Sequence, residues 1–209
     1  MRITVVIPTF NSMKYIDHCL SSVLEQSYEN MEVIIYDNES TDGTYEHLLQ
    51  LEDDRFEVRS IPNLYPNGYR EAMDHVFDNC EGEYVTFVCS DDYIDKSYIS
   101  NYATIIQNSK VEIKCIQSGL TWVNEEGATL QQKIHSYSTL DEFKAKCLGE
   151  SPVNNPTVFY HRSLGPILGD CREAHIRNAL SDIGVGDYDM WCGLADRGVF
   201  IFSVPGFLG

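Results

Sequence analysis

Three apolar segments in the first half of the sequence each run straight into a polar cluster. The segments and clusters are residues 3–7 with Pro8 and Thr9, residues 32–36 with Asp37, and residues 84–88 with Ser90, Asp91 and Asp92. Helical patterns follow the first two, so strands alternate with helices on short connections, which predicts an α/β fold with a parallel sheet and right-handed crossovers. Because ligands bind at the carboxyl ends of strands in such sheets, we expect Thr9, Asp37 and Asp91 to meet there.

Two adjacent carboxylates, Asp91 and Asp92, follow the strand expected at residues 84–88. They repel each other and lose hydration when buried, so they need cations or hydrogen bonds as partners. A divalent ion of the Mg²⁺ or Mn²⁺ type would supply both charge and oxygen coordination. The alternative is a polar turn that caps the next helix, since aspartate is common in both places. These residues alone leave both interpretations open.

The composition suits one globular domain spanning residues 1–209, with 43% hydrophobic and 22% charged residues. The chain has 15 Lys and Arg against 32 Asp and Glu, a formal net charge of −17. This charge argues against nucleic acid or an anionic bilayer as a partner held by long-range electrostatics. A phosphate-bearing ligand would be repelled unless a cation or a local basic cluster offset the field.

The seven cysteines are odd in number and include no CxxC pair, so neither a zinc site nor a full disulfide framework is indicated. Reduced thiols and the absence of a signal peptide or membrane-length apolar run predict a cytoplasmic protein, one that can be peripheral to the inner membrane face. The sequence stops at Phe207-Leu208-Gly209 without a cap or polar tail. We therefore expect the native chain to continue beyond Gly209.

The second half carries a looser pattern of elements. We expect helices at 98–106, at 140–148 and from Asp187 onward, and strands at 113–120, 121–123, 157–160 and 199–204. Arg172, His175 and Arg177 form a local basic group, either a solvated loop or a contact for an anionic ligand. At the other end of the chain, Asn11 or Ser12 is the expected N-cap of the first helix.

Five motifs together resemble the family 2 glycosyltransferases. They are VVIPTFN (residues 5–11), SVLEQSYENMEVIIYDNESTDGT (22–44), NG (67–68), GEYVTFVCSDD (82–92) and GDYDMWCGLADRG (186–198). The resemblance implies the GT-A fold, a single nucleotide-binding α/β domain with a mostly parallel twisted sheet and helices on both faces. It also implies that residues 1–110 bind the nucleotide sugar and that residues 111–209 hold the acceptor and the catalytic base.

The resemblance implies roles for particular residues. Asp37 would accept a hydrogen bond from the imide N–H of uracil, and Asp91, supported by Asp92, would bind a divalent cation, Mn²⁺ or Mg²⁺. Asp187 would be the catalytic base, with Asp189 as the alternative two residues later. The expected nucleotide-binding residues are Pro8, Thr9, Asn11, Asp37, Asn38, Gly68, Arg70 and Ser90.

Three departures from the family pattern bear on activity. Cys89 stands where the family usually has the first acidic residue of its metal-binding motif, and a thiol is a poor ligand for a hard ion. Gly186 replaces the acidic residue that usually precedes the base. Met73-Asp74 replaces an Arg-Asn pair, so Arg70 either takes over the lost contact or pairs with Asp74 at the surface.

The function implied is that of an inverting, metal-dependent glycosyltransferase of the hexosyltransferase type. It would move a sugar from a UDP-sugar donor to a saccharide or lipid-linked saccharide acceptor in polysaccharide biosynthesis. The main alternative is a catalytically silent sugar-nucleotide-binding module. A nucleotidyltransferase would need a glycine-rich basic loop after the first strand, where PTFNS stands instead. A doubly wound regulatory domain would leave the STDGT turn unexplained.

Overall fold

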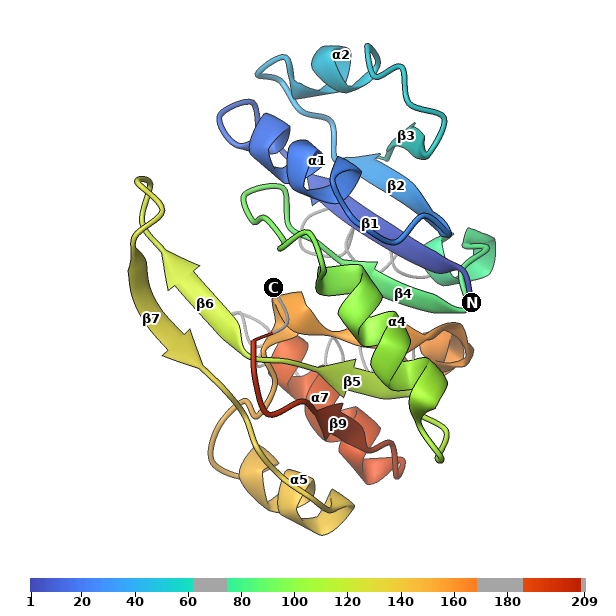
Figure 1. Cartoon of the computed structure of the whole chain (residues 1–209), viewed down its shortest axis with the longest axis vertical. Helices are drawn as coiled ribbons and strands as arrows, with labels where there is room; N and C mark the ends of the chain where they lie inside the picture. The colour runs from blue at the N-terminus through green and yellow to red at the C-terminus, as the bar shows by residue number, and fades with distance from the viewer. Residues whose placement is uncertain (62–74, 169–185, 208–209) are drawn as a thin grey trace. The chain divides into compact units, whose positions relative to one another are not determined.

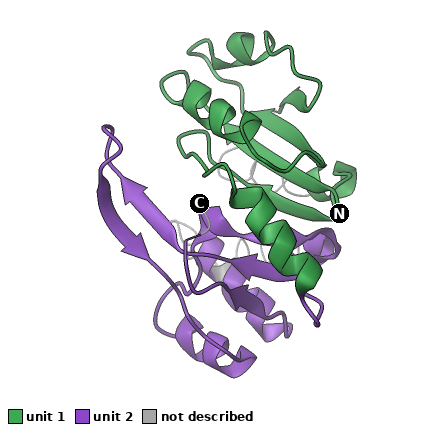
Figure 2. Ribbon diagram, in the orientation of Figure 1, with its two compact units in different colours: residues 1–108, 208–209 green, residues 109–207 purple. Residues whose placement is uncertain are grey.

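The structure is a computed structural model that describes residues 1–61, 75–168 and 186–207. The chain divides into two compact units, which comprise residues 1–108 and 109–207 (Figure 2). The expected single domain over residues 1–209, with its division at residue 110, stays a prediction. The roles assigned to the two halves stay predictions.

Unit 1 is an alternating arrangement of strands and helices (Figure 1). Its strands lie in the order β3-β2-β1-β4, and every neighbouring pair among them is parallel, as the sequence predicts. The elements are β1 (Ile3–Thr9), α1 (Ile16–Leu24), β2 (Met31–Asp37), α2 (Thr44–Leu48), β3 (Phe56–Ser60), β4 (Tyr84–Phe87) and α4 (Tyr98–Asn108).

Helices cover both faces of this sheet. Residues 75–79 are helical, and Val76 packs with Val6, Ile34 and Val85 on one face. Figure 1 shows α1 and α4 in front of the strands, on the other side. Strands buried on both faces read as near-continuous apolar runs, which is why β1 and β2 are so easily recognised in the sequence.

Gly82 permits the close approach of the chain to β1 just before β4 begins. A Cβ atom at this position would lie 2.4 Å from both the backbone nitrogen and the Oγ1 atom of Thr4. The Gly82 amide instead donates to Thr4 Oγ1 at 3.0 Å and to Glu32 Oε1 at 3.1 Å. The glycine therefore sets the entry of the chain into the strand that leads to Asp91 and Asp92.

Unit 2 mixes parallel and antiparallel pairing. Strand β5 pairs antiparallel with β8 and parallel with β9, and β6 and β7 form a separate antiparallel hairpin. The elements are β5 (Cys115–Gln117), β6 (Leu120–Val123), β7 (Thr129–Lys133), α5 (Leu140–Cys147), the 3₁₀ turn η1 (Asn155–Thr157), β8 (Phe159–His161), the 3₁₀ turn η2 (Arg162–Leu164), α7 (Gly186–Asp196) and β9 (Ile201–Ser203).

One strand was not predicted, and two local expectations were wrong. The sequence gives no sign of β7, because four of its five residues are exposed and it lacks apolar alternation. Thr157 belongs to η1 instead of a strand, since Pro156 sits in the first turn of that 3₁₀ helix. The N-cap of α1 is Tyr15, without a side-chain bond, and neither Asn11 nor Ser12 caps the helix.

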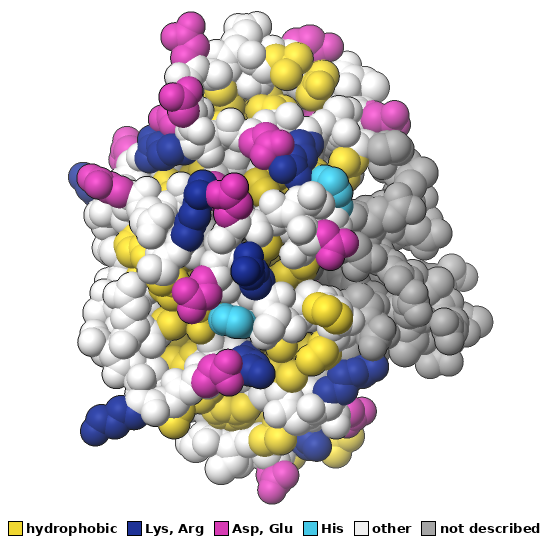
Figure 3. Space-filling view, turned by 90° about the vertical axis from the view of Figure 1, so that its right-hand side faces the viewer, with side chains coloured by type: hydrophobic (Ala, Val, Ile, Leu, Met, Phe, Trp, Pro, Cys, Tyr) yellow, Lys and Arg dark blue, Asp and Glu magenta, His cyan; other side chains and the backbone are white. Residues whose placement is uncertain are grey.

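Charged side chains of both signs are interspersed on the face seen in Figure 3, which shows no large basic area among the described residues. This agrees with a chain whose net charge is −17. No helix within the described ranges is long and apolar enough to cross a membrane.

Candidate active site

The carboxyl ends of β1 and β2 bring two expected site residues together. Thr9 and Asp37 are direct register partners, and both are buried. Thr9 Oγ1 donates to the carbonyl of Tyr36 at 3.1 Å. Asn38 donates to the carbonyl of Thr9 from its backbone nitrogen (2.9 Å) and from Nδ2 (3.1 Å). Pro8, also in β1, lies opposite Tyr36.

The Asp37 side chain accepts two hydrogen bonds from the loop that follows it. Its Oδ2 accepts from the backbone nitrogen of Ser40 at 2.9 Å, and its Oδ1 accepts from Ser40 Oγ at 2.6 Å. The residue has no exposed surface. Each carboxylate oxygen can accept more than one hydrogen bond, so the two bonds from Ser40 do not use up the acceptor capacity of Asp37. Its role in base recognition stays a prediction.

The loop after β2 is fastened to the loop after β1. Asn11 Oδ1 accepts from the backbone nitrogen of Thr41 at 2.8 Å, and the Asn11 nitrogen donates to Ser40 Oγ at 2.9 Å. Asn11 has a φ of 50° and Gly43 a φ of 94°. Both angles lie in the left-handed region, which Asn and Gly occupy most readily. The STDGT turn (residues 40–44) therefore fastens the loop after β2 to the loop after β1 through these hydrogen bonds.

Ser12 and Ser90 connect the ends of β1 and β4. Their hydroxyl oxygens lie 2.7 Å apart, and both residues are buried. The backbone nitrogen of Ser12 also donates to Thr44 Oγ1 at 2.9 Å. Ser12 was expected only as a helix cap, and the 78 residues that separate it from Ser90 hide the contact from sequence reasoning.

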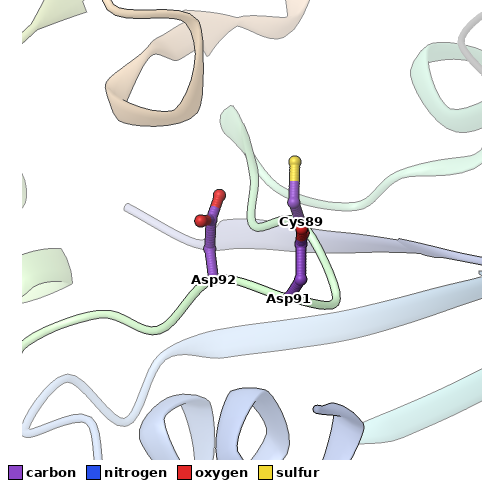
Figure 4. A group of neighbouring side chains, drawn as sticks. All are labelled: Cys89, Asp91 and Asp92. Atoms are coloured by element: carbon purple, nitrogen blue, oxygen red, sulfur yellow. The ribbon is translucent and has the colours of Figure 1, made fainter. Parts of the chain in front are cut away.

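Cys89, Asp91 and Asp92 form one cluster on the loop that follows β4 (Figure 4). Their ligand atoms all lie within 4.8 Å of one another. Asp91 is exposed and Asp92 is more enclosed. Burial and the neighbouring Asp91 charge raise the pKa of Asp92, while a hydrogen bond from Cys89 lowers it. The two carboxylates therefore face the mutual repulsion expected from their sequence.

The donor set fits a hard divalent cation through its oxygen atoms. Asp91 and Asp92 supply the carboxylates that Mg²⁺ and Mn²⁺ prefer, whereas the Cys89 sulfur is a soft ligand. Cys89 has a structural role instead, since its carbonyl accepts from Cys19 Sγ at 3.5 Å. Burial raises the pKa of Cys19 to about 12, with further contributions from Asp92, Cys89 and Asp91. That thiol stays protonated at neutral pH.

Asp187 lies at the start of α7 in unit 2. It is exposed, and its Oδ2 accepts from Asn155 Nδ2 at 2.9 Å. Asp189 lies in the same helix, and its side chain is outside what the structure describes. Asn155 was not among the residues selected from the sequence, because 32 residues separate it from its partner.

Several expected site residues lie outside the described residues. These are Gly68, Arg70, Met73 and Asp74, together with the basic group Arg172, His175 and Arg177. Their expected contacts stay predictions.

Known proteins resemble the chain in both sequence and fold. The model of the Glycosyl transferase family 2 matches residues 4–150. The chain belongs to this family. The family resemblance inferred from the sequence is thereby confirmed, and the match includes four of the five motifs, those within residues 5–92.

A curated relative from Escherichia coli is UDP-Glc:alpha-D-GlcNAc-diphosphoundecaprenol beta-1,3-glucosyltransferase WfaP. It is 32% identical over 109 residues, which cover 52% of this chain and 43% of WfaP. A second, from Bacillus subtilis, is the putative teichuronic acid biosynthesis glycosyltransferase TuaG, 31% identical over 142 residues that cover 66% of this chain and 54% of TuaG. The chain spans about half the length or less of the curated relatives it matches.

Among solved structures, residues 1–349 of Staphylococcus aureus TarS in complex with UDP align with a TM-score of 0.71 and 24% identity. The alignment covers 99% of this chain and 59% of the TarS chain. At this identity the likeness establishes the fold alone. The expected GT-A architecture is therefore confirmed.

Proposed function

We propose that this chain is the donor-binding and catalytic part of an inverting glycosyltransferase that uses a UDP-sugar. The acceptor is a hydroxyl of a saccharide or a lipid-linked saccharide in polysaccharide biosynthesis. Two observations in a family 2 fold carry the proposal. Thr9 and Asp37 are register partners at the ends of β1 and β2, and the contact between Ser12 and Ser90 fastens the loop that carries Asp91 and Asp92 to the end of β1. WfaP is named for a UDP-Glc donor and a diphosphoundecaprenol-linked acceptor, and TarS was solved with UDP.

The chain's own residues suggest how transfer proceeds. Asp37 binds the uracil ring, and Asp187 takes the proton from the acceptor hydroxyl. The hydroxyl oxygen then forms a bond to the anomeric carbon as the bond from that carbon to the diphosphate oxygen breaks. A single displacement inverts the anomeric centre and releases UDP. Asp91 and Asp92 would hold a divalent cation, whose charge offsets that of the diphosphate.

The silent-module alternative rests on Cys89 and Gly186, which depart from the family pattern. The two functions differ in whether a bound donor is consumed. The discriminating experiment measures UDP release from UDP-glucose and UDP-GlcNAc with Mn²⁺. It is run with and without a short-chain GlcNAc-diphospholipid as acceptor. An enzyme releases UDP faster with its acceptor present; tight UDP binding without turnover of any donor would favour the silent module.

Binding should depend on Asp91. We expect UDP with Mn²⁺ to raise the melting temperature far more than either alone, because the cation offsets the charge of the diphosphate. The shift should be easy to measure, since a ligand at 100 times its dissociation constant stabilises a fold by about 2.7 kcal/mol. Asp91→Ala should remove the Mn²⁺-dependent part of this shift. Asp54→Ala, which deletes an exposed carboxylate elsewhere in unit 1, is the matched control and should keep it. An equal shift by UDP in EDTA would contradict the cation assignment.

Base recognition should depend on Asp37. We expect Asp37→Ala to weaken UDP binding by about 1.5–3 kcal/mol, the range for a hydrogen bond to a charged group. The measurement is isothermal titration with UDP and Mn²⁺. Because Asp37 also holds Ser40, the control is Ser40→Ala, which removes the 2.6 Å bond from the same turn but leaves the carboxylate. Equal losses in both variants would mean that Asp37 acts only through the turn.

A further inference from the structure

Asn155 holds the Asp187 carboxylate through its side chain. Its amide nitrogen donates to Asp187 Oδ2 at 2.9 Å, and the bond joins η1 to the first turn of α7. A bond to one carboxylate oxygen restricts the plane of the group, so the position of the second oxygen is restricted too. An amide does this without adding charge. A lysine in its place would form an ion pair and oppose proton uptake by the carboxylate.

The turn that presents Asn155 is itself anchored by buried hydrogen bonds to the carboxyl end of β5. The backbone nitrogen of Asn154 donates to Gln117 Oε1 at 2.8 Å, and Asn154 Nδ2 donates to the carbonyl of Ser118 at 2.9 Å. Thr157 Oγ1 donates to that same carbonyl at 3.1 Å. All four residues are at least 96% buried. Asn155 is therefore bracketed on both sides by residues that have little freedom to move.

The helix that carries Asp187 is anchored as well. Trp191 and Leu194 on α7 are fully buried, and the Tyr188 hydroxyl donates to the carbonyl of Cys147. Both ends of the bond between Asn155 and Asp187 thus belong to elements of unit 2 that are held by buried side chains and hydrogen bonds. Such a bond serves orientation more than stability, because Asp187 itself is exposed.

We propose that Asn155 is a positioning residue for transfer, which orients the Asp187 carboxylate toward the acceptor hydroxyl. This inference rests on the proposed function, with Asp187 as the catalytic base. General-base catalysis requires the carboxylate within hydrogen-bond reach of the proton it removes, and a displacement of about 1 Å can lower a rate by about 10²-fold. The residue acts through Asp187 and touches neither the donor nor the acceptor.

The test compares Asn155→Ala and Asn155→Asp with wild type, using UDP release from UDP-glucose or UDP-GlcNAc with Mn²⁺ and a GlcNAc-diphospholipid acceptor. We expect kcat to fall by about 10- to 100-fold in both variants, while the KM for the donor changes less than about twofold. The carboxylate introduced by Asn155→Asp has the shape of the asparagine amide but donates no hydrogen bond when ionised. Full activity in either variant would overturn the inference.

A double-mutant cycle separates positioning from a general effect on the fold. In the Asp187→Asn background, Asn155→Ala should cause no further loss, because the group that it orients no longer accepts a proton. Additive losses would show that Asn155 acts elsewhere. Thr139→Ala, which removes the side-chain cap of α5 in the same unit, controls for lost stability and should keep kcat. If the wild-type protein turns over no donor, the proposed function fails. If the wild-type protein is active and the Asn155 variants are equally active, the positioning role fails and the proposed function stands.

Discussion

Replacing Asp187 by asparagine is expected to lower the rate of sugar transfer by about 10²- to 10⁴-fold, the usual contribution of a general base. Asparagine keeps the size of the side chain and can still accept a hydrogen bond, but it cannot take the proton from the acceptor hydroxyl. The affinity for UDP with Mn²⁺ should stay near wild type, since Thr9, Asp37 and Asp91 are unchanged. The measurements are transfer kinetics and isothermal titration on the same preparations.

Two matched variants make this result decisive. Asp189→Asn changes the other carboxylate of the same helical turn, and residues two apart on a helix point in different directions. Asp196→Asn makes the same chemical change at the exposed last residue of α7. We expect near-normal transfer from both. A large loss in Asp189→Asn with a silent Asp187→Asn would exchange the two roles, and silence in both would argue against transferase activity.

The fold of unit 1 could be predicted because its strands are buried on both faces. Ile3, Val5, Val6 and Ile7 are at most 1% exposed, so the strand appears in the sequence as an unbroken apolar run that ends at polar residues. Strand β7 has the opposite character. Its exposed sequence TLQQK carries no apolar pattern, and only pairing with β6 makes it a strand. Strands were therefore predicted correctly where burial gives them an apolar sequence. They were missed where only hydrogen bonding to a neighbouring strand defines them.

The site was predictable to the extent that its chemistry is local in sequence. Asp91 and Asp92 are adjacent, so their shared need for a cation is visible without a structure. Contacts between distant residues are not. Ser12 meets Ser90 across 78 residues, and Asn155 meets Asp187 across 32, and no local pattern marks either pair. Such contacts depend on the register of strands and the placement of helices, which arise only in the folded chain.

Unit 2 should depend strongly on Trp191, the largest side chain without exposed surface on α7. Its ring stacks on Tyr160 with centroids 6.1 Å apart and an interplanar angle of 9°. We expect Trp191→Ala to lower the free energy of unfolding by about 3–5 kcal/mol, the usual cost of deleting a large buried aromatic ring. Urea denaturation followed by circular dichroism measures this loss. Transfer should fall with it, because α7 carries Asp187.

Replacing Trp191 by phenylalanine keeps an aromatic ring but removes the indole N–H, so it tests the contribution of that polar group. Trp191 Nε1 is buried and has no hydrogen-bond partner among the described residues. An unpaired buried donor costs about 1–3 kcal/mol, so removing the N–H offsets part of the volume lost in Trp191→Phe. We expect this variant to lose less than half as much stability as the alanine variant. Trp122→Ala, at the 39% exposed tryptophan of β6, should lose far less than Trp191→Ala. If Trp191→Phe proves as damaging as alanine, the indole nitrogen makes a contact that stabilises α7.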